Sequence, residues 1–102
     1  MASTLPSIST IEALIVDLLG SDERFGLDLV ERSGGQLKPG TIYVTLSRME
    51  TKGFLESRQE ARDPDAGGLP RRMYRVTAYG ARVHAAHRLL REALALRPAT
   101  AN

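Results

Sequence analysis

The sequence contains few side chains that could catalyse a reaction or hold a metal ion. His84 and His87 lie three residues apart, a spacing that places two imidazoles on one face of a helix. The chain has no cysteine, and Glu92 is the acidic residue nearby on the same predicted helix, so a metal ion would lack further ligands. Asp63 and Asp65 flank a proline in a loop-forming segment, where a general acid and base could not be held in register. We therefore predict no enzyme activity, no cofactor and no metal site.

The chain carries an excess of positively charged side chains, and they are concentrated in residues 38–102. Residues 1–37 hold two arginines against six acidic residues, a net charge of −4. Residues 38–102 hold twelve lysines or arginines against six acidic residues, a net charge of +6. Twelve of the fourteen cations are arginines, whose planar guanidinium fits phosphates and guanine edges better than an ammonium group does. The asymmetry favours a nucleic-acid partner over a uniformly solvated surface.

A predicted helix that begins at Thr41 is the most informative element. Its residues Ile42, Leu46 and Met49 fall on one narrow stripe, which must face the core. The opposite side and its flanks carry Thr, Ser, Tyr, Val and Arg, with Lys52 at the end, where a solvated helix would normally carry Glu and Lys. These groups suit phosphate oxygens, base edges and thymine methyls. The predicted DNA contacts of this helix are Thr41, Tyr43, Val44, Thr45, Ser47 and Arg48, with Lys52 near the DNA backbone.

Two shorter helices are predicted before this one. Ser9 and Glu12 have the spacing of a capping box at the start of an amphipathic helix over residues 10–19. Residues 21–24 then form a polar connector, and a second helix of about two and a half turns ends at Gly34-Gly35. Together with the helix from Thr41, these elements make a run of three helices.

After the third helix the hydrophobic period changes from 3.6 towards 2. Residues 54–61 and 71–77 are predicted as two strands of a hairpin, joined by a loop rich in turn formers over residues 62–70. Thr77 then caps a final helix over about residues 78–96. The hairpin cations predicted to reach phosphates or the minor groove are Arg58, Arg62, Arg71, Arg72 and Arg75.

Three helices followed by an arginine-edged hairpin are the chain order of a winged helix-turn-helix. The run from Gly40 to Leu55, followed by Arg71-Arg72-Met73-Tyr74-Arg75-Val76-Thr77 and Gly80, resembles the PadR-like transcriptional regulators over roughly residues 11–96. The family motif is kept at Tyr43, Thr45-Leu46, Glu50 and Gly53. The sequence departs at Val44, where the family often has proline, and at Leu27, where an aromatic residue is usual, so the family's operator preferences are not carried over.

The resemblance implies a homodimer that binds double-stranded DNA at a palindromic operator, usually as a repressor. The last helix fits a dimer independently, because its two apolar stripes are wider than one small domain needs to cover. The alternative is a helix that lies flat over its own core. The predicted dimer-interface residues are Ile11, Ile15, Val83, Ala86, His87, Leu90 and Leu94.

The expected fold class is mainly α with a two-stranded β-wing, and the sequence identifies no effector ligand. We expect a flexible N-terminus over residues 1–9, the DNA-binding domain over 10–77, the dimerisation helix over 78–97 and a disordered tail over 98–102. The chain shows no secretory leader and no apolar run of about 20 residues, which predicts a cytoplasmic protein. A second function stays open, in which the basic wing binds an acidic protein partner. Strong salt dependence with any duplex would favour DNA.

Overall fold

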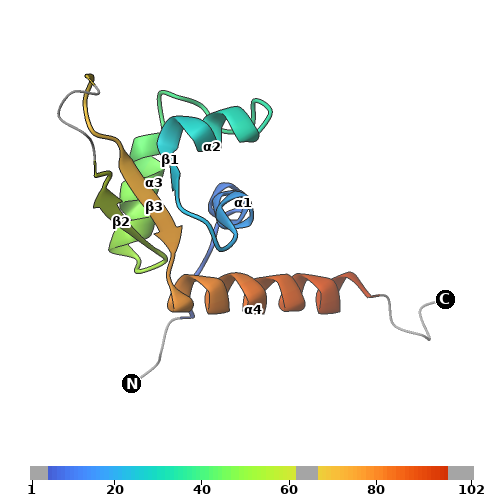
Figure 1. Cartoon of the computed structure of the whole chain (residues 1–102). Helices are drawn as coiled ribbons and strands as arrows, with labels where there is room; N and C mark the ends of the chain where they lie inside the picture. The colour runs from blue at the N-terminus through green and yellow to red at the C-terminus, as the bar shows by residue number, and fades with distance from the viewer. Residues whose placement is uncertain (1–4, 62–66, 97–102) are drawn as a thin grey trace.

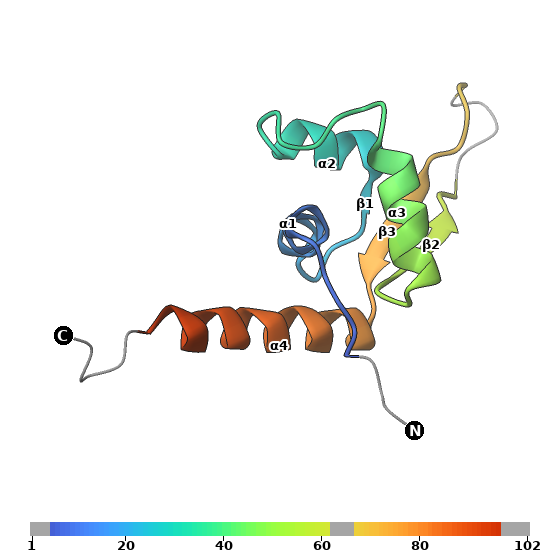
Figure 2. The same ribbon diagram turned by 180° about the vertical axis from the view of Figure 1, so that it is seen from behind.

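The computed structural model describes residues 5–61 and 67–96, and it has the element order of a winged helix-turn-helix. The elements are α1 (Thr10–Leu19), β1 (Arg24–Phe25), α2 (Gly26–Arg32), α3 (Ile42–Thr51), β2 (Leu55–Gln59), β3 (Arg72–Val76) and α4 (Ala78–Ala95). Helices α1, α2 and α3 lie to one side of a small sheet (Figures 1 and 2). Helix α4 runs past the base of this body and extends well beyond α1. The mainly helical fold and the long last helix are as predicted.

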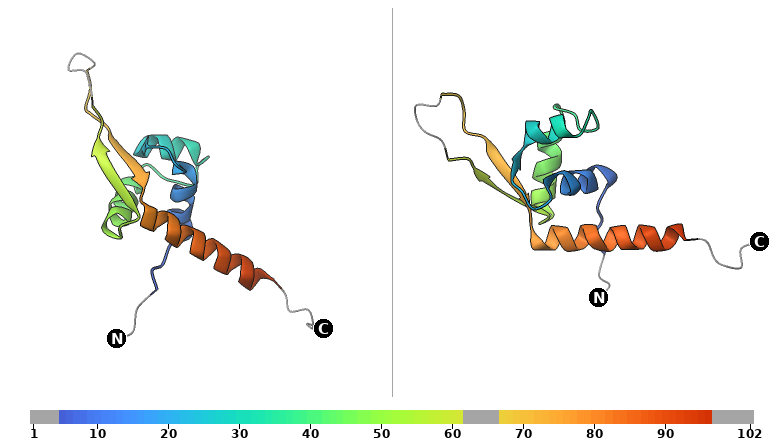
Figure 3. Two further views of the ribbon diagram at one scale, coloured as in Figure 1. Left: turned by 60° about the horizontal axis from the view of Figure 1, so that its bottom comes forward. Right: turned by 45° about the vertical axis from the view of Figure 1, so that its right-hand side comes forward.

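The sheet has three strands, one more than the sequence predicted. Its order is β1-β3-β2, with both pairings antiparallel. Arg24 pairs with Tyr74 and Phe25 with Met73, so the end of the predicted polar connector forms the third strand. A two-residue strand is too short to show alternation in the sequence. It forms because pairing with β3 satisfies backbone groups of the segment between α1 and α2. Figure 3 shows β2 and β3 as a hairpin that projects from the helices.

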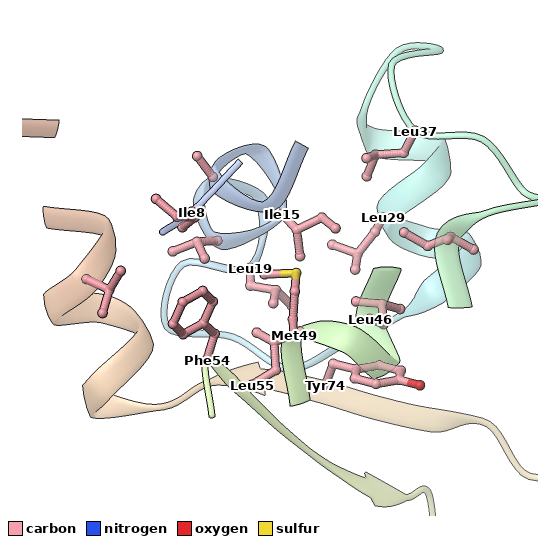
Figure 4. Close-up of a cluster of buried hydrophobic side chains, with 14 residues drawn as sticks. Ile8, Ile15, Leu19, Leu29, Leu37, Leu46, Met49, Phe54, Leu55 and Tyr74 are labelled. Atoms are coloured by element: carbon pink, nitrogen blue, oxygen red, sulfur yellow. The ribbon is translucent and has the colours of Figure 1, made fainter. Parts of the chain in front are cut away.

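One hydrophobic core holds the elements together. Side chains from every helix and from the hairpin meet in it (Figure 4). The predicted stripe of α3 faces this core, with Ile42, Leu46 and Met49 all fully buried. Phe54, at the start of the hairpin, and Tyr74 of β3 close the core on the sheet side. This packing fixes α3 by one face and leaves the opposite face exposed, as the periodicity predicted.

The predicted caps of α1 and α4 are present. Ser9 and Glu12 form both hydrogen bonds of the capping box. The Thr77 hydroxyl accepts a hydrogen bond from the Gly80 amide and donates one to the Gly53 carbonyl oxygen. Gly53 adopts a φ of 81°, which glycine tolerates best, so the chain can turn sharply from α3 into the hairpin.

Two residues of the N-terminal segment that the sequence predicted as flexible, Pro6 and Ile8, contact the body of the protein. Ile8 belongs to the core. His87 Nε2 lies 2.7 Å from the Pro6 carbonyl oxygen, so α4 also holds this segment. A single apolar residue among polar neighbours has no period, and its burial was therefore missed. The expected disordered tail over 98–102 lies outside the described residues.

Helix α4 is attached to the body mainly through its first half. A Cβ atom on Gly80 would lie 2.3 Å from the Phe54 carbonyl oxygen, so glycine permits the close approach of α4 to the hairpin. Val83 is buried in the core, and His84 Nε2 lies 3.0 Å from Asp17 Oδ1 of α1. No helix in the described part of the chain is long and apolar enough to cross a membrane.

Candidate nucleic-acid interface

The outward face of α3 combines exposed side chains of the types that bind DNA. Val44 is 61% exposed, and Ser47, Arg48 and Thr51 are exposed beside it. Thr41 is exposed at the start of the helix, while the hydroxyl of Thr45, on the flank, donates to the Thr41 carbonyl oxygen. The middle of this face therefore offers a methyl-bearing surface, small hydroxyls and one long cation.

Arg48 has a cationic neighbour that the sequence interpretation missed. Lys38, in the turn before α3, lines the same surface hollow as Thr41, Thr45 and Arg48. Among the described residues, no carboxylate lies within ion-pair distance of Lys38 or Arg48. Lys38 Nζ instead donates to the Gly35 carbonyl oxygen. Its position in the turn that leads into α3 was the signal that could have identified it.

The Tyr43 side chain of α3 packs against the first residue of α2. A Cβ atom on Gly26, the first residue of α2, would lie only 2.7 Å from the Tyr43 ring. Glycine at this position thus lets the aromatic ring rest against the α2 backbone. Tyr43 stays half exposed, so its outer edge is still available for the predicted DNA contact.

Lys52, predicted to lie near the DNA backbone, has an ion-pair partner within the chain. Its ammonium group lies 2.8 and 2.9 Å from the two carboxylate oxygens of Glu12 on α1. Burial raises the pKa of Glu12, but hydrogen bonds from Lys52 and Ser9 and the charge of Lys52 outweigh burial, so this pKa lies below its ordinary value. Lys52 is therefore assigned to the joint between α1 and α3. Its partner lies 40 residues away, and no sequence period reports such a contact.

The arginines of the wing divide between the two faces of the sheet. Tyr74 is buried against the core, so alternation places Arg72 on the inner face and Arg71 and Arg75 on the outer face. The outer-face cations are bound to carboxylates. These pairs are Arg58–Glu23 at 2.8 Å, Arg71–Glu60 at 2.7 Å, and Arg75–Glu56. Arg71 also lies over the Phe25 ring, 4.2 Å from its centroid. The hydrogen bonds that Arg58 donates to Glu23 and Arg71 donates to Glu60 raise the pKa values of these two arginines.

Arg72 differs from these three because its contact is a neutral hydroxyl. Its Nη1 donates to Ser57 Oγ at 3.0 Å, and no carboxylate in the described ranges forms an ion pair with it. Arg72 therefore forms no direct ion pair within the described ranges, and it lies on the side of the hairpin that faces α3. The predicted contact Arg62 lies outside the described residues.

The predicted dimer-interface set needs a correction. Ile15 is fully buried inside its own chain and Val83 is 5% exposed, so neither presents a surface to a second subunit. Both face the core because they lie on the inner stripes of α1 and α4. Ala86, Leu90 and Leu94 are exposed, as is Ile11 of α1, while His87 is partly covered by the N-terminal segment.

The described residues contain no group of three His, Cys, Asp or Glu side chains that could bind a metal ion.

The fold and its outward helix define the class of the protein. Helices α2 and α3, the turn between them and the antiparallel wing form a winged helix-turn-helix, in which the second helix of the motif is the one that enters the major groove in DNA-binding members. Residues 15–86 match the model of the transcriptional regulator PadR-like family. The chain belongs to this family, which agrees with the resemblance in the sequence. It is a family of transcriptional regulators and not of enzymes.

Individual relatives agree with this assignment. Transcriptional regulator Rv3488 of Mycobacterium tuberculosis is 43% identical over 51 residues, which are 50% of this chain and 44% of that protein. The chain thus aligns with less than half of this curated relative. A PadR family transcription regulator from Clostridium difficile has a TM-score of 0.71 at 25% identity, covering 84% of this chain and 91% of the other. The family member from Eggerthella lenta has a TM-score of 0.71 at 27% identity, covering 83% and 74%.

A further solved structure shares the fold. PadR of Bacillus subtilis, in complex with operator DNA, has a TM-score of 0.64 at 23% identity and covers 91% of this chain and 51% of that chain. At this identity the likeness concerns the fold alone.

Proposed function

We propose that the protein is a sequence-specific DNA-binding repressor that occupies a palindromic operator as a homodimer. The observation that carries the proposal is the exposed face of α3. It bears hydroxyls, Val44 and Arg48. Beside it lie Lys38 and Arg72, which form no direct ion pair in the described part of the chain. The B. subtilis relative in complex with operator DNA supports the same use of the shared fold.

Two kinds of contact are expected at this surface. The short side chains of Thr41, Val44 and Ser47 let α3 approach the floor of the major groove. Arg48 is the residue of this face that is long enough to place two donors on the O6 and N7 atoms of a guanine. Lys38 and Arg72 flank the helix and would neutralise phosphates, which position the protein without reading sequence.

The homodimer is supported by the outer half of α4. Leu90 and Leu94 follow Val83 at intervals of seven and four residues, so they continue the core-facing stripe of the helix beyond the body. They are 51% and 76% exposed in the single chain, and Ile11 is exposed on α1. A second copy of the chain would cover this apolar surface. A two-fold axis between the copies would match the symmetry of a palindrome.

A salt titration of DNA binding tests the proposal. We expect fluorescence anisotropy with a labelled mixed-sequence duplex to give an affinity that falls steeply with salt, because each neutralised phosphate releases counterions. Polyglutamate serves as the probe for an acidic protein partner. Tight binding to polyglutamate with weak, non-saturable binding to duplex would instead favour a protein-interaction module and would overturn the proposal.

A further inference from the structure

The wing carries a serine whose hydroxyl connects it to α3. Ser57 of β2 accepts a hydrogen bond from Arg72 Nη1 at 3.0 Å and donates one to Glu50 Oε2 of α3 at 2.8 Å. A serine hydroxyl has one proton and two lone pairs, so donation to a carboxylate leaves a lone pair free for the guanidinium. The hydroxyl therefore bridges a cation and an anion that belong to different elements.

The strand register places this bridge on the inner face of the sheet. Ser57 lies opposite Tyr74, which is buried beside it, and Arg72 lies two residues from Tyr74 on the same face. Helix α3 and the hairpin run side by side (Figures 1 and 2). Glu50 follows Ser47 by three residues, so the bridge meets α3 on the flank next to a predicted DNA contact. Burial of Tyr74, followed by the nearby charge of Glu50, raises the pKa of its phenol, so Tyr74 stays neutral here.

The bridge restrains Arg72 through a hydroxyl, and the Glu50 carboxylate lies beyond that hydroxyl without a direct ion pair to Arg72. In contrast, the charges of Arg58, Arg71 and Arg75 are each paired directly with a carboxylate of the same chain. A hydroxyl contact holds the guanidinium in one region while leaving its positive charge available to an anion. Restraining a long side chain before binding lowers the entropy that is lost when it meets a phosphate.

We propose that Ser57 and Glu50 are positioning residues, which hold Arg72 on the α3 side of the wing so that helix and wing engage the same stretch of duplex. The inference rests on the proposed function, since it concerns how the DNA surface is arranged. Neither Ser57 nor Glu50 needs to touch DNA for this role. Their effect passes through Arg72, which is the point that an experiment must isolate.

A double-mutant cycle on Ser57 and Arg72 tests the inference, with Ser57→Thr as the matched control that keeps the hydroxyl. Binding of each variant to the labelled mixed-sequence duplex is measured over a salt series. We expect Ser57→Ala to weaken binding about three- to tenfold, since one side chain loses its restraint. Ser57→Thr should bind like the wild type. Arg72→Ala should weaken binding at least as much and lower the slope of log affinity against log salt by about one per subunit.

The decisive result is the double variant. Ser57→Ala combined with Arg72→Ala should bind no more weakly than Arg72→Ala alone, because the hydroxyl then has no guanidinium to hold. Additive losses would mean that Ser57 acts independently of Arg72 and would overturn the inference. Wild-type affinity in Ser57→Ala would also overturn it, while the proposed function would stand. A wild-type protein that binds no duplex would overturn the proposed function and this inference together. Thermal unfolding of each variant separates lost positioning from lost folding.

Discussion

Replacing Lys52 by methionine should cost stability and leave DNA binding intact. The two carboxylate oxygens of Glu12 lie 2.8 and 2.9 Å from the ammonium group, and the Glu12 side chain is 4% exposed. Removing one member of a fully buried ion pair costs about 3 to 5 kcal/mol, because the remaining charge is stranded. Lys52 is 33% exposed, and Glu12 keeps its hydrogen bond from the Ser9 amide. We therefore expect about half of that cost, roughly 2 kcal/mol in the free energy of unfolding.

The pH dependence of this loss has a definite sign. The pKa of Glu12 is lowered in the folded protein. The Glu12 charge therefore contributes its full stabilisation at pH values above 4.5, the ordinary pKa of glutamate. That contribution is lost as the pH falls through the lowered, folded-state pKa. The stability difference between wild type and Lys52→Met should therefore be largest near neutral pH and should shrink in acid.

Urea unfolding at one fixed protein concentration measures these differences. Glu12→Gln is the matched variant, because glutamine can keep the capping box while the charge is removed. It should cost less than Lys52→Met, since the lysine that it leaves unpaired can turn towards water. Unchanged stability in Lys52→Met, together with a reduced salt slope of DNA binding, would refute the reasoning. Lys52 would then be the DNA contact that the sequence predicted.

Three further changes test other parts of the structure. Gly80→Ala puts a methyl group 2.3 Å from a backbone carbonyl oxygen, so thermal unfolding should show a loss of about 1 to 3 kcal/mol; Gly40→Ala, which meets nothing within 4 Å, should show little, and equal effects would contradict this packing. Leu90→Glu places a charge in the proposed dimer seam, and sedimentation should then give a monomer where the wild type is a dimer; a monomeric wild type at tens of micromolar would contradict the dimer. Arg72→Ala should lower the salt slope of duplex binding by about one per subunit while Arg75→Ala, already paired with a carboxylate, should change it less; the reverse order would mean that the outer face of the wing meets DNA.

The features that the sequence predicted correctly are set by nearby residues. The capping box of Ser9 and Glu12, the cap at Thr77 and the apolar stripe of α3 each depend on side chains within a few positions of one another. Such local signals were enough to predict the winged helix-turn-helix and the exposed face of α3.

The features that it missed depend on residues far apart in the chain. The carboxylate that binds Lys52 lies 40 residues before it, and β1 exists only because β3 arrives beside it. Ile15 was assigned to a dimer interface because an apolar stripe does not say which of two surfaces covers it. The sequence also treats the wing arginines as equivalent. Their carboxylate partners become visible only when the strands are paired.

The central claim is that α3 reads DNA sequence. It is tested by selecting bound fragments from a random duplex library with the wild type and with Arg48→Ala. We expect the wild type to select a palindromic site. Arg48→Ala should select the same site with relaxed preference at one position in each half, and should lose about 1 to 3 kcal/mol of affinity for the original site. If the wild type selects no common sequence, or if Arg48→Ala selects the same site with unchanged base preference and affinity, α3 is not the reading helix that we propose.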